Sequence, residues 1–300
     1  MEDHPLCHAG SLALTDPQQH CRATTNRHRA DWSGGLLAPS GARRAKGGAM
    51  DLGLDQRVYL VTGGSKGLGR ATVDVLVAEG ARVVVSGRDA DSLAAVTAAH
   101  GEQVVAVQAD NADAATPDRL IETAQARWGR VDGALVSVGG PPYGGVLDVD
   151  DEAWRGAFET VFLGAVRLGR ELAAALGAGG AIGFVLSSSV RSPIPGLAVS
   201  NGLRPGLAMV AKTLADEVGP RGVRVVSLLP GRIETERTAA LDATADDPTE
   251  QRRTSEAGIA LRRYGRPEEF GRVAAFALSP AASYLTGTAL AVDGGALRTL

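Results

Sequence analysis

The sequence predicts a single α/β domain, a doubly wound parallel sheet of the Rossmann type with helices on both faces. Two observations predict it. Short apolar runs rich in valine alternate with segments of helical periodicity from residue 57 to residue 294, which is the pattern of repeated βαβ units. The first apolar run also leads into a glycine-rich turn, "VTGGSKGLGRA" (61–71), of the kind that opens a dinucleotide-binding unit.

Each element can be assigned from its own pattern. The apolar runs are nearly continuous rather than alternating, as expected of strands buried on both faces of a sheet. The expected strands are 57–63, 81–87, 103–110, 131–140, 180–189, 223–231 and 288–294. The expected helices are 69–80, 89–101, 116–129, 151–176, 203–219 and 267–279. The start at 203 depends on Pro205, which suits the first turn of a helix and would break its interior.

Composition excludes several classes of protein. Hydrophobic residues make up 44% and charged residues 22% of the chain, as in soluble globular proteins, and the formal net charge is −3. This charge gives no reason to expect a nucleic acid or an anionic membrane as partner. No apolar run reaches the roughly 18 residues of a transmembrane helix. We expect a cytoplasmic protein, because the chain has only two cysteines and so suits a reducing compartment.

Residues 1–49 differ from the rest. They hold four of the five histidines and both cysteines, Cys7 and Cys21, and show no helix or strand periodicity. The Cys-His pairs match no spacing that favours zinc, so we expect no metal site. Two cysteines exclude a disulfide scaffold and favour a reducing compartment. We expect a disordered extension, or upstream sequence translated from an early start codon, before a domain that covers residues 50–300.

The turn after the first strand predicts a phosphate site. Gly63, Gly67 and Gly69 allow a tight turn in which backbone N–H groups approach a pyrophosphate at a helix N-terminus. The other turn residues expected to bind the cofactor are Thr62, Ser65, Lys66 and Leu68.

The end of the second strand favours NADP(H) over NAD(H). An acidic residue at this place would bind the ribose 2′-hydroxyl, whereas an arginine accommodates a 2′-phosphate. The sequence has "SGRD" (86–89), with Gly87 in the acidic position and Arg88 after it. Lys66 adds a second positive charge that the phosphate would attract.

These motifs resemble the short-chain dehydrogenase/reductase family over residues 55–298, particularly its 3-oxoacyl-acyl-carrier-protein-reductase-like members. The similar features are the Thr62–Gly69 turn, the motif "LLPGRIET" (228–235) and the ending from "RYGRPEEF" to "AVDGG". The resemblance implies that Thr235 contacts the nicotinamide amide, that Asp110 binds adenine, and that the protein is a homodimer or homotetramer. It also implies that residues 232–263 cover the substrate. The remaining implied cofactor residues are Asn111, Gly139, Arg204, Pro230, Gly231 and Ile233.

The resemblance fails at three of the four catalytic positions. The family uses an Asn-Ser-Tyr-Lys set, in which tyrosine protonates the carbonyl oxygen. The corresponding residues here are Val161, Ser187, Ser200 and Arg204. An aliphatic hydroxyl such as that of Ser200 is a far poorer proton donor than a phenol, and a guanidinium stays protonated and cannot relay a proton.

The replacements are similar to those of an atypical subgroup of this family. That subgroup has Ser-Asn-x-x-Arg in place of the Tyr-Lys pair, "GGPP" after the fourth strand, and a basic residue four positions after the serine. Here these are Ser200–Arg204, Gly139–Pro142 and Arg191. Tyr143 and Arg191 are the candidates to supply the proton or to polarise a carbonyl.

Two functions remain open. The first is an NADP-dependent oxidoreductase that acts on a small-molecule carbonyl or alcohol with an altered proton-delivery set. The second is a non-catalytic NADP-binding protein, such as a redox sensor or the partner of an active relative in a hetero-oligomer. Fold alone does not decide between them.

Overall fold

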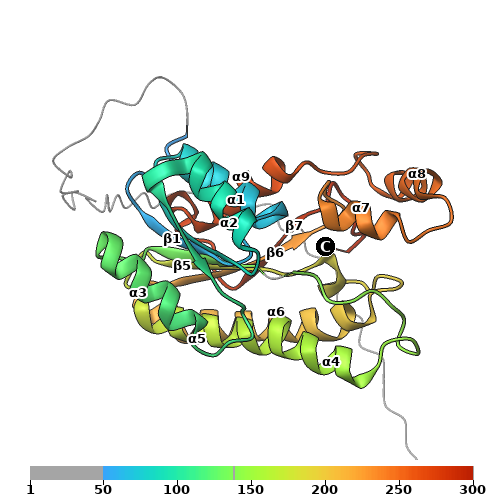
Figure 1. The fold of residues 1–300 in the computed structure, drawn as a ribbon, viewed down its shortest axis with the longest axis horizontal. Helices are drawn as coiled ribbons and strands as arrows, with labels where there is room; N and C mark the ends of the chain where they lie inside the picture. The colour runs from blue at the N-terminus through green and yellow to red at the C-terminus, as the bar shows by residue number, and fades with distance from the viewer. Residues whose placement is uncertain (1–49, 138, 300) are drawn as a thin grey trace, which may run out of the picture. The chain divides into compact units, whose positions relative to one another are not determined.

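The computed structural model describes residues 50–137 and 139–299, and the predictions for residues 1–49 lie outside this range. Seven parallel strands form one sheet in the order β3-β2-β1-β4-β5-β6-β7 (Figure 1). The strands are β1 (Val58–Val61), β2 (Arg82–Gly87), β3 (Val104–Gln108), β4 (Gly133–Val136), β5 (Ala181–Val185), β6 (Arg224–Pro230) and β7 (Thr288–Val292). The predicted fold class is confirmed.

Helices cover both faces of the sheet (Figure 1). One face packs against α1 (Gly67–Ala78), α2 (Ala90–His100) and α9 (Pro267–Leu278), and the other against α3 (Thr116–Trp128), α5 (Gly164–Ala175) and α6 (Ala198–Val218). Alternate residues of a strand point to opposite faces. Tyr59 and Val61 accordingly belong to the core beside α1, and Val58 and Leu60 to the core beside α3 and α5. Because both faces are covered, all four side chains are buried.

The strand order reverses direction beside β1, which pairs with β2 on one side and β4 on the other. The connections that follow β1 and β4 therefore leave in opposite directions and open a crevice at the carboxyl ends of these strands. The loops after β5 and β6 reach the same edge, since every strand is parallel. The site described below lies at this edge.

The prediction for the start of α6 is wrong. The helix begins at Ala198, five positions before the expected start, and Pro205 lies in its interior. Tertiary contacts hold the first turn: Val199 and Ser200 are buried, and the Ala198 N–H donates to Gly144 O at 3.1 Å. These contacts outweigh the helix-breaking preference of proline.

The helices differ from the predicted ones at two places. A π-helical turn, Phe158–Leu163, interrupts the helix predicted at 151–176 and separates α4 (Asp151–Ala157) from α5. Two further helices, α7 (Glu236–Asp242) and α8 (Pro248–Gly258), lie in the segment expected to cover the substrate. None of the helices in the described part of the chain is both long and apolar enough to cross a membrane.

Candidate active site

A cleft of about 1060 Å³ lies at the carboxyl ends of the strands. All but two of the predicted site residues line it. Those residues are Gly63, Ser65, Lys66, Gly67, Leu68, Gly69, Arg88, Asp110, Asn111, Gly139, Tyr143, Ser187, Ser200, Arg204, Pro230, Gly231, Ile233 and Thr235. The two exceptions are Thr62 and Arg191. Among the described residues, no group of three or more His, Cys, Asp or Glu side chains is placed to hold a metal ion.

The glycine turn presents the N-terminus of α1 to the cleft. Gly63 and Gly67 have φ angles of +57° and +54°, which favour glycine. A side chain on Gly69 would collide with the carbonyl of Gly63, so the turn packs closely on itself. No side chain caps the helix, and its first turn carries no acidic residue. The N-terminal amides and the positive end of the helix dipole thus fit a pyrophosphate.

Thr62 has a different role from the predicted cofactor contact. Its buried hydroxyl donates to Ser137 O at 2.6 Å and accepts from Ser137 N at 2.9 Å. The side-chain amide of Asn111 also donates to this hydroxyl at 3.4 Å. Since its hydrogen-bonding capacity is used within the protein, Thr62 joins the ends of β1 and β4 and so shapes the floor of the cleft.

The end of β2 carries a glycine, Gly87, and lies beside residues of both charges. A Cβ on Gly87 would lie 2.9 Å from Ser65 Oγ, so a side chain there would require the Ser65 hydroxyl of the glycine turn to move. Arg88 is exposed and its guanidinium lies 3.9 Å from the Asp110 carboxylate. Lys66 is exposed at the start of α1. Both cations are free to reorient toward a phosphate.

Three serines meet after β5. Ser187 Oγ lines the cleft and accepts from the Ser189 N–H at 3.0 Å. Its own hydroxyl proton remains available for a ligand. Ser189 Oγ lies 3.2 Å from Ser200 Oγ, and both of these residues are buried. Ser200 therefore touches the cleft only at its inner wall.

Arg204 is a buried cation in the wall of the cleft. Its side chain is 5% exposed, Nη1 donates to Val185 O at 2.6 Å, and Nε has no hydrogen-bond partner in the described protein. Burial, and secondarily the charge of Arg237, lowers the pKa of Arg204 to about 10. The group remains charged at neutral pH. A buried charged group with an unpartnered N–H lowers the stability of the protein unless a ligand accepts a hydrogen bond from that N–H.

Of the two candidates to supply the proton or polarise a carbonyl, Tyr143 lines the cleft and Arg191 does not. Arg191 does not point into the cleft: its Nη2 donates to Ala289 O of β7 at 3.1 Å, because the turn at Ser188–Val190 directs the side chain toward that strand. Tyr143 does line the cleft and is 54% exposed. Its ring lies against Gly196, where any Cβ would collide with it.

Comparison with known proteins identifies the family. The sequence profile described as enoyl-(acyl carrier protein) reductase matches residues 63–296. The chain belongs to the short-chain dehydrogenase/reductase family. It is 34% identical over 249 residues to a 3-oxoacyl-[acyl-carrier-protein] reductase of Synechocystis, a match that covers 81% of this chain and 97% of the relative. It is also 34% identical over 260 residues to an L-rhamnose 1-dehydrogenase (NAD(P)(+)) of Azotobacter vinelandii, covering 81% and 97%.

A solved short-chain reductase shares the fold. L-Sorbose reductase from Gluconobacter frateurii, crystallised with NADPH and L-sorbose, superposes with a TM-score of 0.77 and is 29% identical. The match covers 84% of this chain and all of the reductase. The protein therefore belongs to the class of NAD(P)-dependent oxidoreductases that act on carbonyl or alcohol substrates.

Among the residues of the cleft wall that no sequence motif indicates are Arg237 and Thr160. Arg237, in the first turn of α7, lies flat against Gly140 and donates from Nη2 to Pro141 O at 2.6 Å. Burial lowers its pKa. Thr160, in the π-helical turn, lines the cleft while the neighbouring Val161 is buried. π-helical turns often mark functional sites, but their unusual hydrogen bonding leaves no clear sequence pattern.

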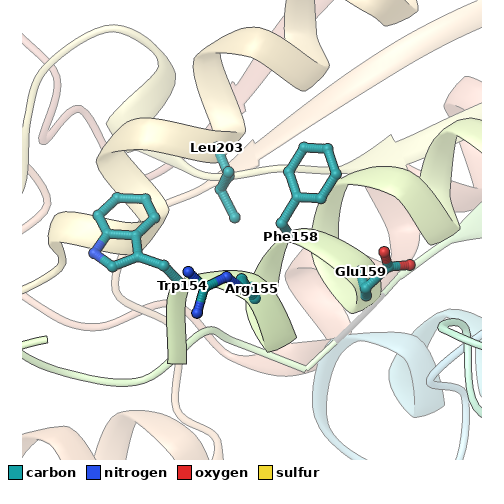
Figure 2. A pocket seen from close by; sticks show the side chains of 5 residues that line it. All are labelled: Trp154, Arg155, Phe158, Glu159 and Leu203. Carbon is teal, nitrogen blue, oxygen red and sulfur yellow. The ribbon is translucent and has the colours of Figure 1, made fainter. Parts of the chain in front are cut away.

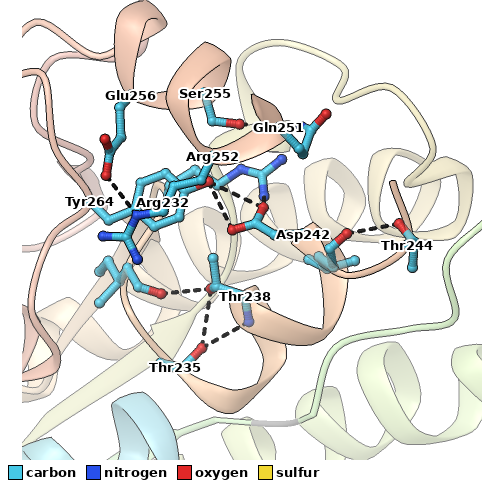
Figure 3. A network of polar contacts seen from close by, with 12 residues as sticks. Arg232, Thr235, Thr238, Asp242, Thr244, Gln251, Arg252, Ser255, Glu256 and Tyr264 are labelled. Atoms are coloured by element: carbon cyan, nitrogen blue, oxygen red, sulfur yellow. Dashed lines mark hydrogen bonds and ion pairs between the residues drawn. The ribbon is translucent and has the colours of Figure 1, made fainter. Parts of the chain in front are cut away.

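A network of polar contacts joins residues of the segment that follows β6 (Figure 3). The Tyr264 hydroxyl donates to both oxygens of Asp242, at 3.0 and 3.2 Å, and Arg232 Nη1 donates to the same carboxylate at 2.8 Å. The guanidinium of Arg252 lies over the Tyr264 ring, 4.7 Å from its centroid. These contacts join α7, α8 and the loop after β6. Within residues 232–263, which the resemblance implies cover the substrate, α7 and α8 are therefore joined by polar contacts through Tyr264.

A second, smaller hollow of about 370 Å³ lies outside the cleft, between α4 and α6. Figure 2 shows its lining of Trp154, Arg155, Phe158, Glu159 and Leu203. Phe158 is 41% exposed and stacks on Phe162, with ring centroids 5.3 Å apart. The lining of this hollow is mostly apolar and lacks the convergent polar groups of an active site.

Proposed function

We propose that the protein is an NADP(H)-dependent oxidoreductase of a carbonyl/alcohol pair, with an altered set of proton-delivery residues. The observation that carries the proposal is Arg204, a buried guanidinium that lines the cleft with an unpartnered Nε. A ribose hydroxyl of the bound cofactor is a suitable acceptor for it. The cofactor supplies the hydride chemistry when bound.

Each remaining role follows from the chemistry of the residue. Ser187, with its hydroxyl proton unused, would donate to the substrate oxygen and stabilise the charge that develops there. Tyr143 is the candidate proton donor, since it is the predicted acid that lines the cleft. Ser200, hydrogen-bonded to Ser189 and far too weak an acid, would position the inner wall instead.

Preference for NADP(H) is part of the proposal. Two observations support it: the exposed cations Lys66 and Arg88 beside the end of β2, and a glycine in place of an acidic residue at position 87. Arg88 would exchange its weak contact with Asp110 for a charge-assisted hydrogen bond to the 2′-phosphate.

The alternative is a non-catalytic NADP-binding protein. It is supported by the absence of tyrosine from residues 196–218 and by the burial of Ser200, which occupies the position of the family's acid. A redox sensor or hetero-oligomer partner would need the same cofactor residues but no proton donor.

The test is a titration with NADPH and NADH, followed by nicotinamide fluorescence, and then an assay of NADPH oxidation against ketones, aldehydes, quinones and 3-oxoacyl thioesters. Binding of NADPH with turnover of any carbonyl would support the enzyme. Binding without turnover across the panel would favour the sensor. Failure to bind either cofactor would contradict both.

We also propose that the protein forms a homodimer or homotetramer through α4 and α6. The exposed ring of Phe158 and the apolar hollow beside it support this, because such patches on a monomer commonly mark interfaces. Light scattering coupled to size-exclusion chromatography tests it: a mass of one subunit, near the 30.8 kDa of the chain, would contradict the proposal.

A further inference from the structure

Two arginines from different helices line the cleft. Arg204 comes from α6 and is anchored to Val185 at the end of β5. Arg237 comes from α7 and is anchored to Pro141 in the loop after β4. Each guanidinium uses one of its nitrogens to hold a backbone carbonyl, and both belong to the lining of the cleft. They are close enough that the charge of Arg237 lowers the pKa of Arg204.

Neither guanidinium forms an ion pair within residues 50–137 and 139–299. The neighbouring Arg232 behaves in the ordinary way, with Nη1 2.8 Å from the Asp242 carboxylate. Glu236 also lines the cleft, but no ion pair joins it to Arg204 or Arg237. The remaining lining carboxylates, Asp89 and Asp110, lie at the ends of β2 and β3, beside Lys66 and Arg88.

Two like charges held together without a carboxylate are unfavourable in a partly buried site. Arg237 is nevertheless held by a hydrogen bond to a backbone carbonyl and by close packing, and not by an ion pair. Gly140 has no side chain where the guanidinium lies, and any Cβ there would collide with it. An anionic ligand between the two arginines would remove the repulsion, and a guanidinium binds a carboxylate through a pair of parallel hydrogen bonds.

The phosphates of a dinucleotide have their own site. The uncapped N-terminus of α1 and the glycine turn offer backbone amides, and Lys66 and Arg88 lie at the end of β2. The anion that Arg237 would bind must therefore come from a second ligand in the cleft.

We infer that Arg237, with the charge of Arg204 beside it, binds a carboxylate of the substrate, so that the substrate class is oxo acids and hydroxy acids rather than neutral ketones or sugars. This inference rests on the proposed function, because it assumes that a carbonyl or alcohol substrate shares the cleft with the cofactor. It gives Arg237 a specificity role and leaves hydride transfer to the groups already described.

The test compares each carboxylate with its neutral primary amide, which is similar in shape. Pyruvate, levulinate and 4-oxocyclohexanecarboxylate are titrated, each beside its amide, into protein loaded with NADP⁺, which cannot reduce them, and intrinsic tryptophan fluorescence is the readout. At least one carboxylate should bind about tenfold more tightly than its amide, the range of a hydrogen bond to a charged group. Arg237→Gln should abolish this ratio and Arg237→Lys should reduce it. The matched control is Arg127→Gln, which removes one exposed arginine from α3.

Other outcomes overturn the inference in distinguishable ways. If no carboxylate exceeds its amide in wild-type protein that binds NADPH, the carboxylate site is absent while the proposed function stands. If Arg237→Gln weakens NADPH binding and leaves the ratio unchanged, Arg237 serves the cofactor phosphates instead. If wild-type protein binds neither cofactor, the proposed function fails and this inference fails with it. Thermal melts of all variants show whether each one is folded.

Discussion

The side-chain amide of Asn201 forms two hydrogen bonds with the backbone of a single residue, Ile194. Asn201 Oδ1 accepts from Ile194 N, and Nδ2 donates to Ile194 O, both at 2.9 Å. Asn201 lies in the first turn of α6, and Ile194 lies in the loop that carries the chain from the serines to this helix. Ile194 and Leu197 line the cleft. The hydrogen bonds between Asn201 and Ile194 therefore help to shape the wall of the cleft.

We expect Asn201→Ala to lower the free energy of unfolding by about 1–3 kcal/mol, because it leaves two backbone groups without their partners. Urea denaturation measures this. Asn201→Asp keeps the acceptor for Ile194 N but places a carboxylate oxygen against Ile194 O in place of the donor, so it should also be less stable than wild type. If Asn201→Ala unfolds like wild type, the loop does not depend on this pair.

Arg88→Gln should raise the Kd for NADPH about tenfold or more and leave the Kd for NADH unchanged, since only the 2′-phosphate distinguishes the two cofactors. Fluorescence titration of both cofactors measures the ratio. Arg127→Gln, which changes net charge equally at a distance, serves as control. An equal loss of affinity for NADH would show that Arg88 does not select the phosphate.

Ser187→Ala should lower kcat by about a hundredfold or more, the usual effect of removing one donor to a developing oxyanion. The affinity for NADPH should not change, because the hydroxyl is expected to face the substrate. Ser188→Ala is the comparison, since this neighbouring serine also lines the cleft. If Ser188→Ala loses turnover and Ser187→Ala does not, the role belongs to Ser188.

The sequence was sufficient for the sheet but not for the helix that carries Ser200 and Arg204. Continuous valine-rich runs such as 82–85 have no alternative to a buried strand. The start of α6 depends instead on contacts distant in sequence. A Cβ on Gly202 would lie 2.9 Å from the Trp154 indole, so glycine lets α6 pack closely on α4. Nothing in the residues around Pro205 indicates that contact.

A motif that specifies the backbone was enough to predict which residues lie in the cleft, whereas the direction of a single side chain was not predictable in this way. The glycine turn and the Pro230–Gly231 turn lie in the cleft because their position follows from strand order. Arg191 was expected in the cleft because of its spacing from Ser187, yet a short 3₁₀ turn directs it toward β7. Arg237 lies in the cleft although its surroundings resemble an ordinary exposed helix.

A last prediction concerns alkaline stability. Tyr59 is fully buried on β1, its ring lies against Gly133, and its hydroxyl has no hydrogen-bond partner in the described structure. Burial raises the pKa of Tyr59 to about 12; the charge of Arg57 lowers this pKa by a smaller amount, and the charge of Asp132 raises it by a smaller amount. In the unfolded chain the same phenol ionises near a pKa of about 10.

Because the folded pKa is the higher one, the contribution of Tyr59 to stability is fully present below a pH of about 10 and is lost as the pH rises toward about 12. The complete loss corresponds to about 3 kcal/mol, from a pKa difference of about two. Tyr59→Phe lacks this titration and removes an unpartnered buried hydroxyl, so at neutral pH it should be within about 1 kcal/mol of wild type. Urea denaturation of both proteins at increasing pH should show the variant gaining on wild type only above a pH of about 10. Parallel curves through that range would mean that the Tyr59 hydroxyl titrates alike in the folded and unfolded chains. The comparison cancels the other tyrosine whose pKa burial raises, Tyr264, because it is present in both proteins.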